Sequence, residues 1–113
     1  MKNSFVQIFN RQVLYQEKVL EKRNEKLKVP GDSLKWFSYH IQAMVEELGE
    51  VMKADKRWKT HRNERYVTEE KKDEIADVFI TAMNIAMYSG FTANEIEEAI
   101  ENKINENEKK LGA

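Results

Sequence analysis

The chain has 113 residues, 41% of them hydrophobic, which fits one domain (1–113) that is large enough for a core and small enough to gain from association. Nineteen basic and twenty acidic residues leave a formal net charge of -1, so no general electrostatic attraction to nucleic acid or to a membrane is expected. The absence of cysteine excludes disulfides, thiolate metal sites and cysteine nucleophiles. With no signal-peptide core and no apolar run of membrane-spanning length, a cytoplasmic location is expected.

The first half of the chain predicts two helices. One proline, four glycines and no strand-like alternation favour an all-α fold of four helices. The first helix is expected from Ser4 to Lys26, and it ends before Pro30. Asp32 or Ser33 can cap a second helix that reaches about Ala54. Its apolar stripe comprises Leu34, Phe37, Ile41, Met44, Val45, Leu48 and Val51 or Met52, and its other stripe carries acids.

The second half predicts a loop and two more helices. The polar stretch 55–67 is interpreted as a mobile loop. Thr68 can cap a third helix that runs to about Ser89, and Gly90 is a left-handed stop. A capping box, Thr92 to Glu95, opens a last helix that reaches about Lys110.

The third helix carries apolar residues around nearly its whole circumference. A single chain of this size can hardly cover such a helix on every side. We therefore expect a four-helix-bundle-type protomer that assembles as a homodimer or as a dimer of dimers, with this helix near the interface.

Two clusters of acids suggest a metal site. Glu47 and Glu50 lie three residues apart on the second helix, and Glu74 and Asp77 have the same spacing on the third. At about 3.6 residues per turn, each pair falls on one helical face. Either pair alone is more typical of a solvated helix face. Because both pairs are embedded in apolar helices, the two together favour a site in which the four acids share a cation. Glu46 is a further ligand, a base or simply a surface residue.

The ligand chemistry points to a hard cation. Oxygen ligands without cysteine or suitably spaced histidine favour Mg²⁺ first and Mn²⁺ second. Neither His40 nor His61 has a glutamate three residues before it, which weakens a di-iron alternative. Magnesium held by carboxylates usually serves a phosphate substrate, so hydrolysis of a phosphate ester or anhydride is expected.

Each acid pair belongs to a longer line of polar and aromatic residues on its helix. On the third helix the line runs Glu74, Asp77, Thr81, Asn84, Tyr88, and buried polar atoms on such a line need partners. On the second helix, Trp36 and His40 lie on the same side as the acids. This arrangement suggests a pocket that binds a metal at one end and a flat ligand at the other. Each also has a structural interpretation: Trp36 as core, His40 as a structural histidine, and Asn84 as a hydrogen-bonding residue.

The last helix places three polar residues on one stripe: Lys103, Asn107 and Lys110. On spacing alone they are surface residues. The basic residues of the loop are likewise more typical of a solvated surface than of a phosphate clamp.

The motif Glu46-Glu47-x-x-Glu50, followed by Glu74-x-x-Asp77, resembles the EExxE and ExxD signature of the MazG-like superfamily of all-α nucleoside triphosphate pyrophosphohydrolases. The resemblance runs from about Trp36 onward and includes Asn84, Gly90 and the Lys103-x-x-x-Asn107-x-x-Lys110 pattern. It implies Mg²⁺-dependent cleavage of a (deoxy)nucleoside triphosphate to the monophosphate and pyrophosphate, by a dimer or a dimer of dimers.

The resemblance also implies residue roles. Glu47, Glu50, Glu74 and Asp77 would hold metal, and a metal-bound water deprotonated by Glu46 or Glu47 would attack the α-phosphorus. The substrate-binding residues would be Trp36, His40 and Asn84 around the base and sugar, and Lys103, Asn107 and Lys110 near phosphates or ribose, in the same copy's site or in a neighbour's.

Three other interpretations stay open. Arg57-Trp58-Lys59 is similar to a segment of dimeric all-α dUTPases, which makes dUTP a candidate substrate. Phosphoribosyl-ATP pyrophosphatase is another member of the superfamily, and it is less favoured because no feature of the sequence is specific to its substrate. A non-catalytic helical interaction module, whose acids only pair with lysines and arginines, is the alternative of another class.

Overall fold

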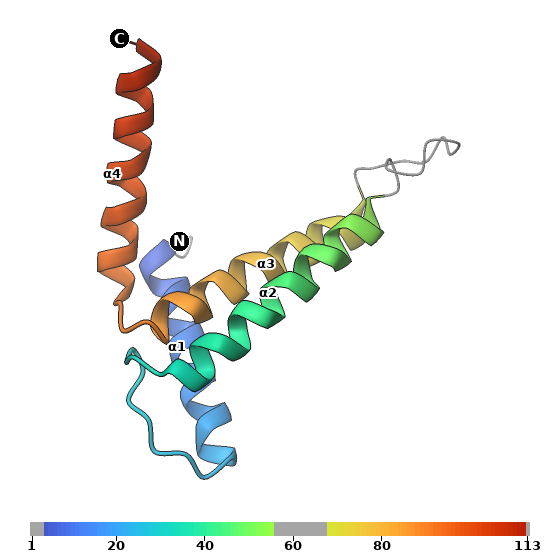
Figure 1. Ribbon diagram of the computed structural model, residues 1–113, viewed down its shortest axis with the longest axis vertical. Helices are drawn as coiled ribbons and strands as arrows, with labels where there is room; N and C mark the ends of the chain where they lie inside the picture. The colour runs from blue at the N-terminus through green and yellow to red at the C-terminus, as the bar shows by residue number, and fades with distance from the viewer. Residues whose placement is uncertain (1–3, 56–67, 113) are drawn as a thin grey trace.

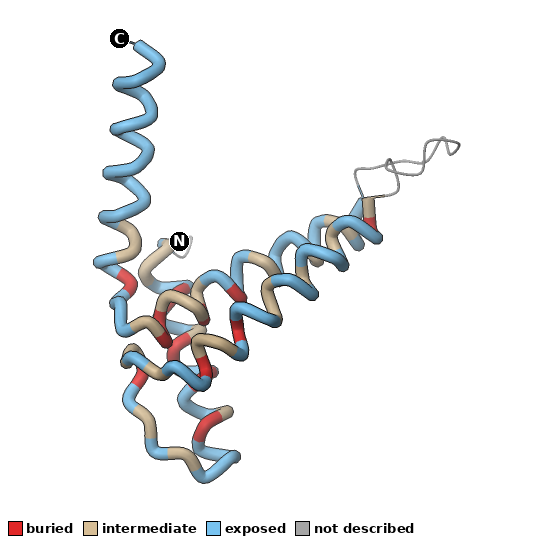
Figure 2. The backbone as a smooth tube through the Cα atoms, in the orientation of Figure 1, coloured by how far each residue is buried: buried red, intermediate tan, exposed pale blue. Residues whose placement is uncertain are grey.

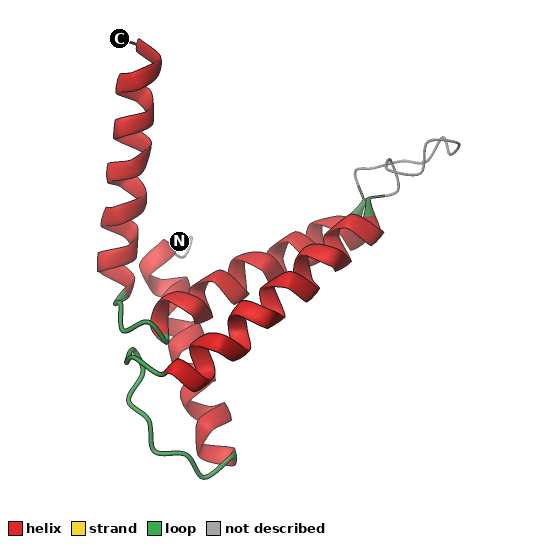
Figure 3. Cartoon of the chain, viewed as in Figure 1, coloured by secondary structure: helices red, strands yellow, loops and turns green. Residues whose placement is uncertain are grey.

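The computed structural model describes residues 4–55 and 68–112, which form four helices and no strand. The helices are α1 (Phe5–Lys22), α2 (Leu34–Ala54), α3 (Glu69–Met87) and α4 (Ala93–Gly112), and Figure 3 shows the loops that join them. The all-α prediction is therefore confirmed. The predicted mobile loop lies, from Lys56 to Val67, outside the described residues. Within the described ranges, no helix is both long enough and apolar enough to cross a membrane.

Side-chain caps define where three helices begin, as the sequence predicts. The Ser33 hydroxyl accepts a hydrogen bond from the backbone N–H of Trp36, so Ser33, rather than Asp32, caps α2. Thr68 caps α3 in the same way. The predicted box before α4 is confirmed: the N–H of Glu95 donates to the Thr92 hydroxyl, and the N–H of Thr92 donates to the Glu95 carboxylate.

The end of α1 differs from the prediction. The helix stops at Lys22 instead of continuing to Lys26, because Asn24 adopts a left-handed conformation with φ 57°. The N–H of Glu25 then bonds back to the carbonyl of Leu20 at 3.0 Å, as in a Schellman motif. Asparagine tolerates this conformation better than most residues, but the helical periodicity of the sequence continues past it.

The end of α3 has the predicted left-handed stop. Gly90 has φ 91°, and the N–H of Phe91 bonds to the carbonyl of Ala86 at 3.2 Å. The regular helix ends at Met87, two residues before the predicted end at Ser89. The stop turns the chain sharply into α4.

The helices α2 and α3 lie side by side as a long antiparallel hairpin (Figure 1). Helix α1 crosses the hairpin near its base, and α4 packs against α1 at its start and then runs away from the other helices. The base of the hairpin is tied by backbone hydrogen bonds, in which the N–H of Gly31 donates to Met87 and the N–H of Ser33 donates to Tyr88. At the other end, the Lys71 ammonium lies 2.8 Å from the Asp55 carboxylate.

The core lies at this crossing, where Figure 2 shows most of the buried residues. Phe9 and Leu20 of α1, with Met87 and Tyr88 at the end of α3, are its largest fully buried side chains. From the crossing outward, the described part of the hairpin has only its own two helices for packing. A single chain therefore builds its core at one end of the molecule.

Most of the apolar stripe of α2 faces away from this core, and only Phe37 at its start packs against the core cluster. Val45 is 68% exposed, and on α3 Phe79 is also 68% exposed. The stripe buried in α2 is instead the one with Trp36 and His40, which also carries Glu47. Seven of the exposed large apolar side chains of the two helices are named here the hairpin face: Leu34, Ile41, Val45, Leu48 and Met52 of α2 with Ile75 and Phe79 of α3.

Candidate metal centre and its surroundings

Three carboxylates meet across the hairpin. Glu47 of α2 and Glu74 and Asp77 of α3 each offer one oxygen, and these oxygens all lie within 4.8 Å of one another. Glu74 and Asp77 reach the same point because three residues make almost one helical turn. Glu47 and Glu74 are half-buried and Asp77 is exposed. The three residues can therefore hold a metal ion, with an open side toward solvent.

The electrostatics of this cluster are unfavourable without a cation. Partial burial raises the pKa of Glu47 above its ordinary value, and the negative charges of Asp77 and Glu74 raise it further. Burial also raises the pKa of Glu74, with Asp77 next in importance. A bound divalent cation would offset both effects, because it replaces repulsion between carboxylates with attraction to a common positive charge.

Two neighbouring acids stand outside the three-residue cluster. Glu50 is exposed and is not one of the three, yet its charge contributes to the raised pKa of both Glu47 and Glu74. Glu46 is also exposed, and its charge contributes to the raised pKa of Glu47. Both acids therefore lie near the cluster, and the ligand role of Glu50 and the base role of Glu46 stay predictions.

The polar line of α3 finds its partners, as the sequence predicts. The Thr81 hydroxyl donates to the backbone carbonyl of Asp77 at 2.9 Å. From α1, the Gln12 side-chain amide donates to Asn84 Oδ1 at 3.0 Å, and Gln16 accepts from the Tyr88 hydroxyl at 2.9 Å. Burial raises the pKa of Tyr88 to about 12, so it remains a neutral donor.

Sequence reasoning missed the role of these two glutamines. Gln12 and Gln16 occupy the core-facing stripe of α1, four residues apart, where apolar residues would be expected. A pair of amides at that spacing inside an apolar stripe is the pattern that could have indicated their role, because buried amides require polar partners on the facing helix.

Trp36 and His40 lie in the core instead of lining an open pocket in this single chain. Trp36 is 6% exposed, and its indole N–H donates to Glu25 at 2.9 Å. His40 is 7% exposed and stacks on Tyr88, with ring centres 5.4 Å apart and planes 8° apart. Its Nε2 is buried without a hydrogen-bond partner, and burial lowers the pKa of the imidazole. Contact between these rings and a ligand stays a prediction.

The three polar residues predicted on the last helix lie apart from the acids in one chain. Lys103, Asn107 and Lys110 are all exposed on the part of α4 that extends away from the hairpin (Figure 1). The Lys103 ammonium lies 3.7 Å from Glu106 on the same helix. Any contribution to the metal site would therefore require another copy of the chain.

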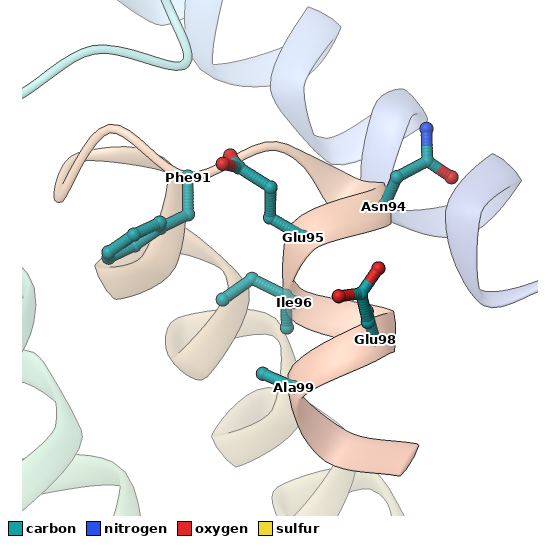
Figure 4. Close-up of a pocket in the computed structure, with 6 residues that line it drawn as sticks. All are labelled: Phe91, Asn94, Glu95, Ile96, Glu98 and Ala99. Carbon is teal, nitrogen blue, oxygen red and sulfur yellow. The ribbon is translucent and has the colours of Figure 1, made fainter. Parts of the chain in front are cut away.

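A surface pocket of about 500 Å³ lies at the start of α4, away from all predicted site residues. In Figure 4, Phe91, Ile96 and Ala99 lie on one side of it and the polar groups of Asn94 and Glu98 on the other. Its charged lining residues are Glu95 and Glu98, and Glu95 is already engaged in the helix cap. This lining offers no cation for a phosphate.

Comparison of the chain with family models, with curated proteins and with solved structures finds no match.

Proposed function

We propose that the chain is a metal-dependent nucleoside triphosphate pyrophosphohydrolase of the MazG-like type, which works as a homo-oligomer. The observation that carries the proposal is the convergence of Glu47, Glu74 and Asp77, whose oxygens lie within 4.8 Å of one another. These residues come from both halves of the acidic signature, which are far apart in the sequence. A solvated helix face alone would not require the two halves to meet.

The donor set fits a hard divalent cation, with Mg²⁺ preferred over Mn²⁺, because all three ligands are carboxylate oxygens. When bound, such an ion would neutralise negative charge on the phosphates during cleavage. Glu47, Glu74 and Asp77 would hold the ion, with Glu50 as the predicted fourth ligand. Glu46 or Glu47 would accept the proton of the attacking water.

The assembly in this proposal uses the hairpin face. Two copies can pack these apolar stripes against each other in an isologous interface, which would cover the sides of α2 and α3 that a single chain leaves exposed. The predicted phosphate-binding residues of α4 would then act on the site of a neighbouring copy. Trp36, His40 and Asn84 would border the base and sugar after local rearrangement, because all three are buried in the single chain.

The proposal is tested by pyrophosphate release from a panel of nucleoside triphosphates, dUTP included, with Mg²⁺. Asp77→Asn should lower kcat/KM by at least about a hundredfold, since it removes a ligand at the reacting centre. Glu21→Gln is the control: it removes an exposed carboxylate of α1 whose charge is not among those that raise the pKa of Glu47 or Glu74, and it should keep the activity. Equal activity of the two variants, or no turnover of any nucleotide by the parent, would contradict the proposal.

Metal binding is tested separately by the melting temperature. Without divalent ions, Glu74→Gln should melt at a higher temperature than the parent, because it removes a charge that burial and then the neighbouring Asp77 disfavour, as the raised pKa of Glu74 indicates. With Mg²⁺ the parent should gain stability and the variant should gain less, because a ligand that binds only the folded state stabilises it.

A non-catalytic interaction module is the second candidate, and the burial of Trp36, His40 and Asn84 favours it. It predicts no nucleotide turnover and no increase in melting temperature with Mg²⁺ or Mn²⁺. The two experiments above therefore separate the candidates.

A further inference from the structure

A groove of about 460 Å³ runs along α1 where it meets α3, on a different part of the surface from the hairpin face. Its apolar lining includes Ile8, Tyr15, Ile80 and Met83, and two cations, Arg11 and Lys18, border it. Ile8 and Tyr15 are 45% and 59% exposed. Arg11 and Lys18 lie seven residues apart, so they share one edge of the helix, about 10.5 Å from each other at about 1.5 Å per residue.

The free part of α4 presents a surface of complementary character. Ile100, Ile104 and Leu111 form an apolar stripe, and Leu111 is 89% exposed. One edge of this stripe carries acids, among them Glu101 and Glu108, and the other edge carries Lys103 and Lys110.

The charges of the two surfaces match in sign and spacing. Glu101 and Glu108 lie seven residues apart, as do Arg11 and Lys18, so both acids can meet both cations when α4 lies along α1 in the one direction that puts its acidic edge beside them. Within the described ranges, none of these four charges has an ion-pair partner. The apolar stripe of α4 would then cover the apolar lining of the groove.

The helix that fills the groove has to come from a second copy. The start of the chain's own α4 is anchored in the core, where Ala93 is 3% exposed and Ile96 packs against the core cluster. From this anchor α4 runs away from the other helices (Figure 1). Reaching its own groove would require α4 to leave the core.

We infer that two copies of the chain exchange their C-terminal helices, each placing the apolar stripe of α4 into the α1–α3 groove of the other. The exchange is reciprocal, so it forms a closed two-fold interface. It is separate from the hairpin face and independent of the proposed catalysis. An assembly that used both interfaces would contain more than two copies.

The test is a charge exchange between two variants. Variant A carries Arg11→Glu and Lys18→Glu, and variant B carries Glu101→Lys and Glu108→Lys. In each variant alone, the groove edge and the acidic edge of α4 have the same sign, so association should weaken by at least about tenfold. In an equimolar mixture, the groove of A faces the α4 of B and the groove of B faces the α4 of A, and every pair is again opposite in charge.

Sedimentation velocity gives the mass of each sample, and circular dichroism confirms that each variant keeps its helix content. We expect A and B to have lower average masses than the parent at the same concentration, and the mixture to regain the parent's mass. A matched control carries Lys103→Glu and Lys110→Glu on the opposite edge of α4. Its net charge changes by the same amount as that of variant A, and it should keep the parent's mass.

Two outcomes would overturn the inference. Parental mass in both A and B would mean that the groove and α4 do not associate. Loss of mass in A and B that mixing does not restore would mean that the charges act within one copy. Neither outcome bears on nucleotide turnover or on metal binding, so the inference and the proposed function fail independently.

Discussion

His40 combines burial, ring stacking and an unbonded nitrogen in one side chain. Because burial lowers its pKa from the ordinary 6.5, the unfolded chain binds a proton at a higher pH than the folded chain. The free energy of unfolding should therefore fall as the pH is lowered from 6.5 toward the pKa of the folded state. Urea unfolding at about pH 7.5 and about pH 5.5 measures this loss.

The variant His40→Phe isolates the contribution of this residue. Phenylalanine keeps an aromatic ring against Tyr88 and removes the titrating nitrogen, so the loss of stability between the two pH values should be smaller than in the parent. His61 is present in both proteins and its titration cancels. The raised pKa of Glu47 and Glu74 acts in the opposite direction, favouring the folded state at low pH, and it cancels in the same way. An unchanged pH dependence in the variant would show that His40 is not the cause.

At the residue scale, the sequence predicted the three carboxylates that cluster, Glu47, Glu74 and Asp77, because helical spacing is regular and acid pairs are easy to recognise. It did not show that Trp36 and His40 would be buried in the core of a single chain. Their burial depends on Tyr88 at the end of α3 and on Glu25 in the loop before α2. No periodic pattern links these positions, so only the folded arrangement reveals the contacts.

Two glycines in different elements should respond in opposite ways to the same substitution. Gly49 lies inside α2, where an added methyl group would meet no atom within 4 Å, so Gly49→Ala should raise the free energy of unfolding by about 0.5–1 kcal/mol. Gly90 has φ 91°, a conformation unfavourable for alanine, so Gly90→Ala should lower it by about 1–2 kcal/mol. Urea unfolding of both variants checks the signs, and a stabilising Gly90→Ala would contradict the assigned backbone.

At the element scale, capping residues made the helix starts predictable, since Ser33, Thr68 and Thr92 act locally. The end of α1 was not predictable from periodicity, because the left-handed Asn24 interrupts a pattern that otherwise continues. The sequence also did not show which face of α2 turns toward the core of the same chain. An apolar stripe indicates that a face is covered, but it does not tell whether the same chain or another copy covers it.

For the whole molecule, the hairpin face is the basis of the proposed two-copy assembly. Val45→Lys places a charge in the middle of this face and should lower the average mass in sedimentation velocity. Since Val45 is 68% exposed in a single chain, helix content should stay the same. Gln42→Lys, on an exposed position of the same helix, is the matched control and should leave the mass unchanged. Dissociation by both variants, or by neither, would contradict the assignment of this face.

The relative placement of the four helices could be predicted least. Pairing of α2 with α3 was predicted from two acid pairs that could share one cation. The crossing of α1 and the departure of α4 depend instead on a few contacts around Phe9, Tyr88 and Ala93. Such crossings depend on the shapes of particular side chains at the contact, which no sequence period encodes.

Because the core lies at one end of the hairpin, resistance to local unfolding should vary along its length. Backbone amides near His40 and Asn84 belong to the end of the hairpin that packs on the core, whereas among the described residues those near Lys53 and Lys71 have only the opposite helix beside them. Amide hydrogen exchange in dilute solution should therefore be slow at the base of the hairpin and progressively faster toward its far end. The three carboxylates lie between these extremes, so a bound cation should slow exchange most in the outer half, where it would join two helices that little else holds together.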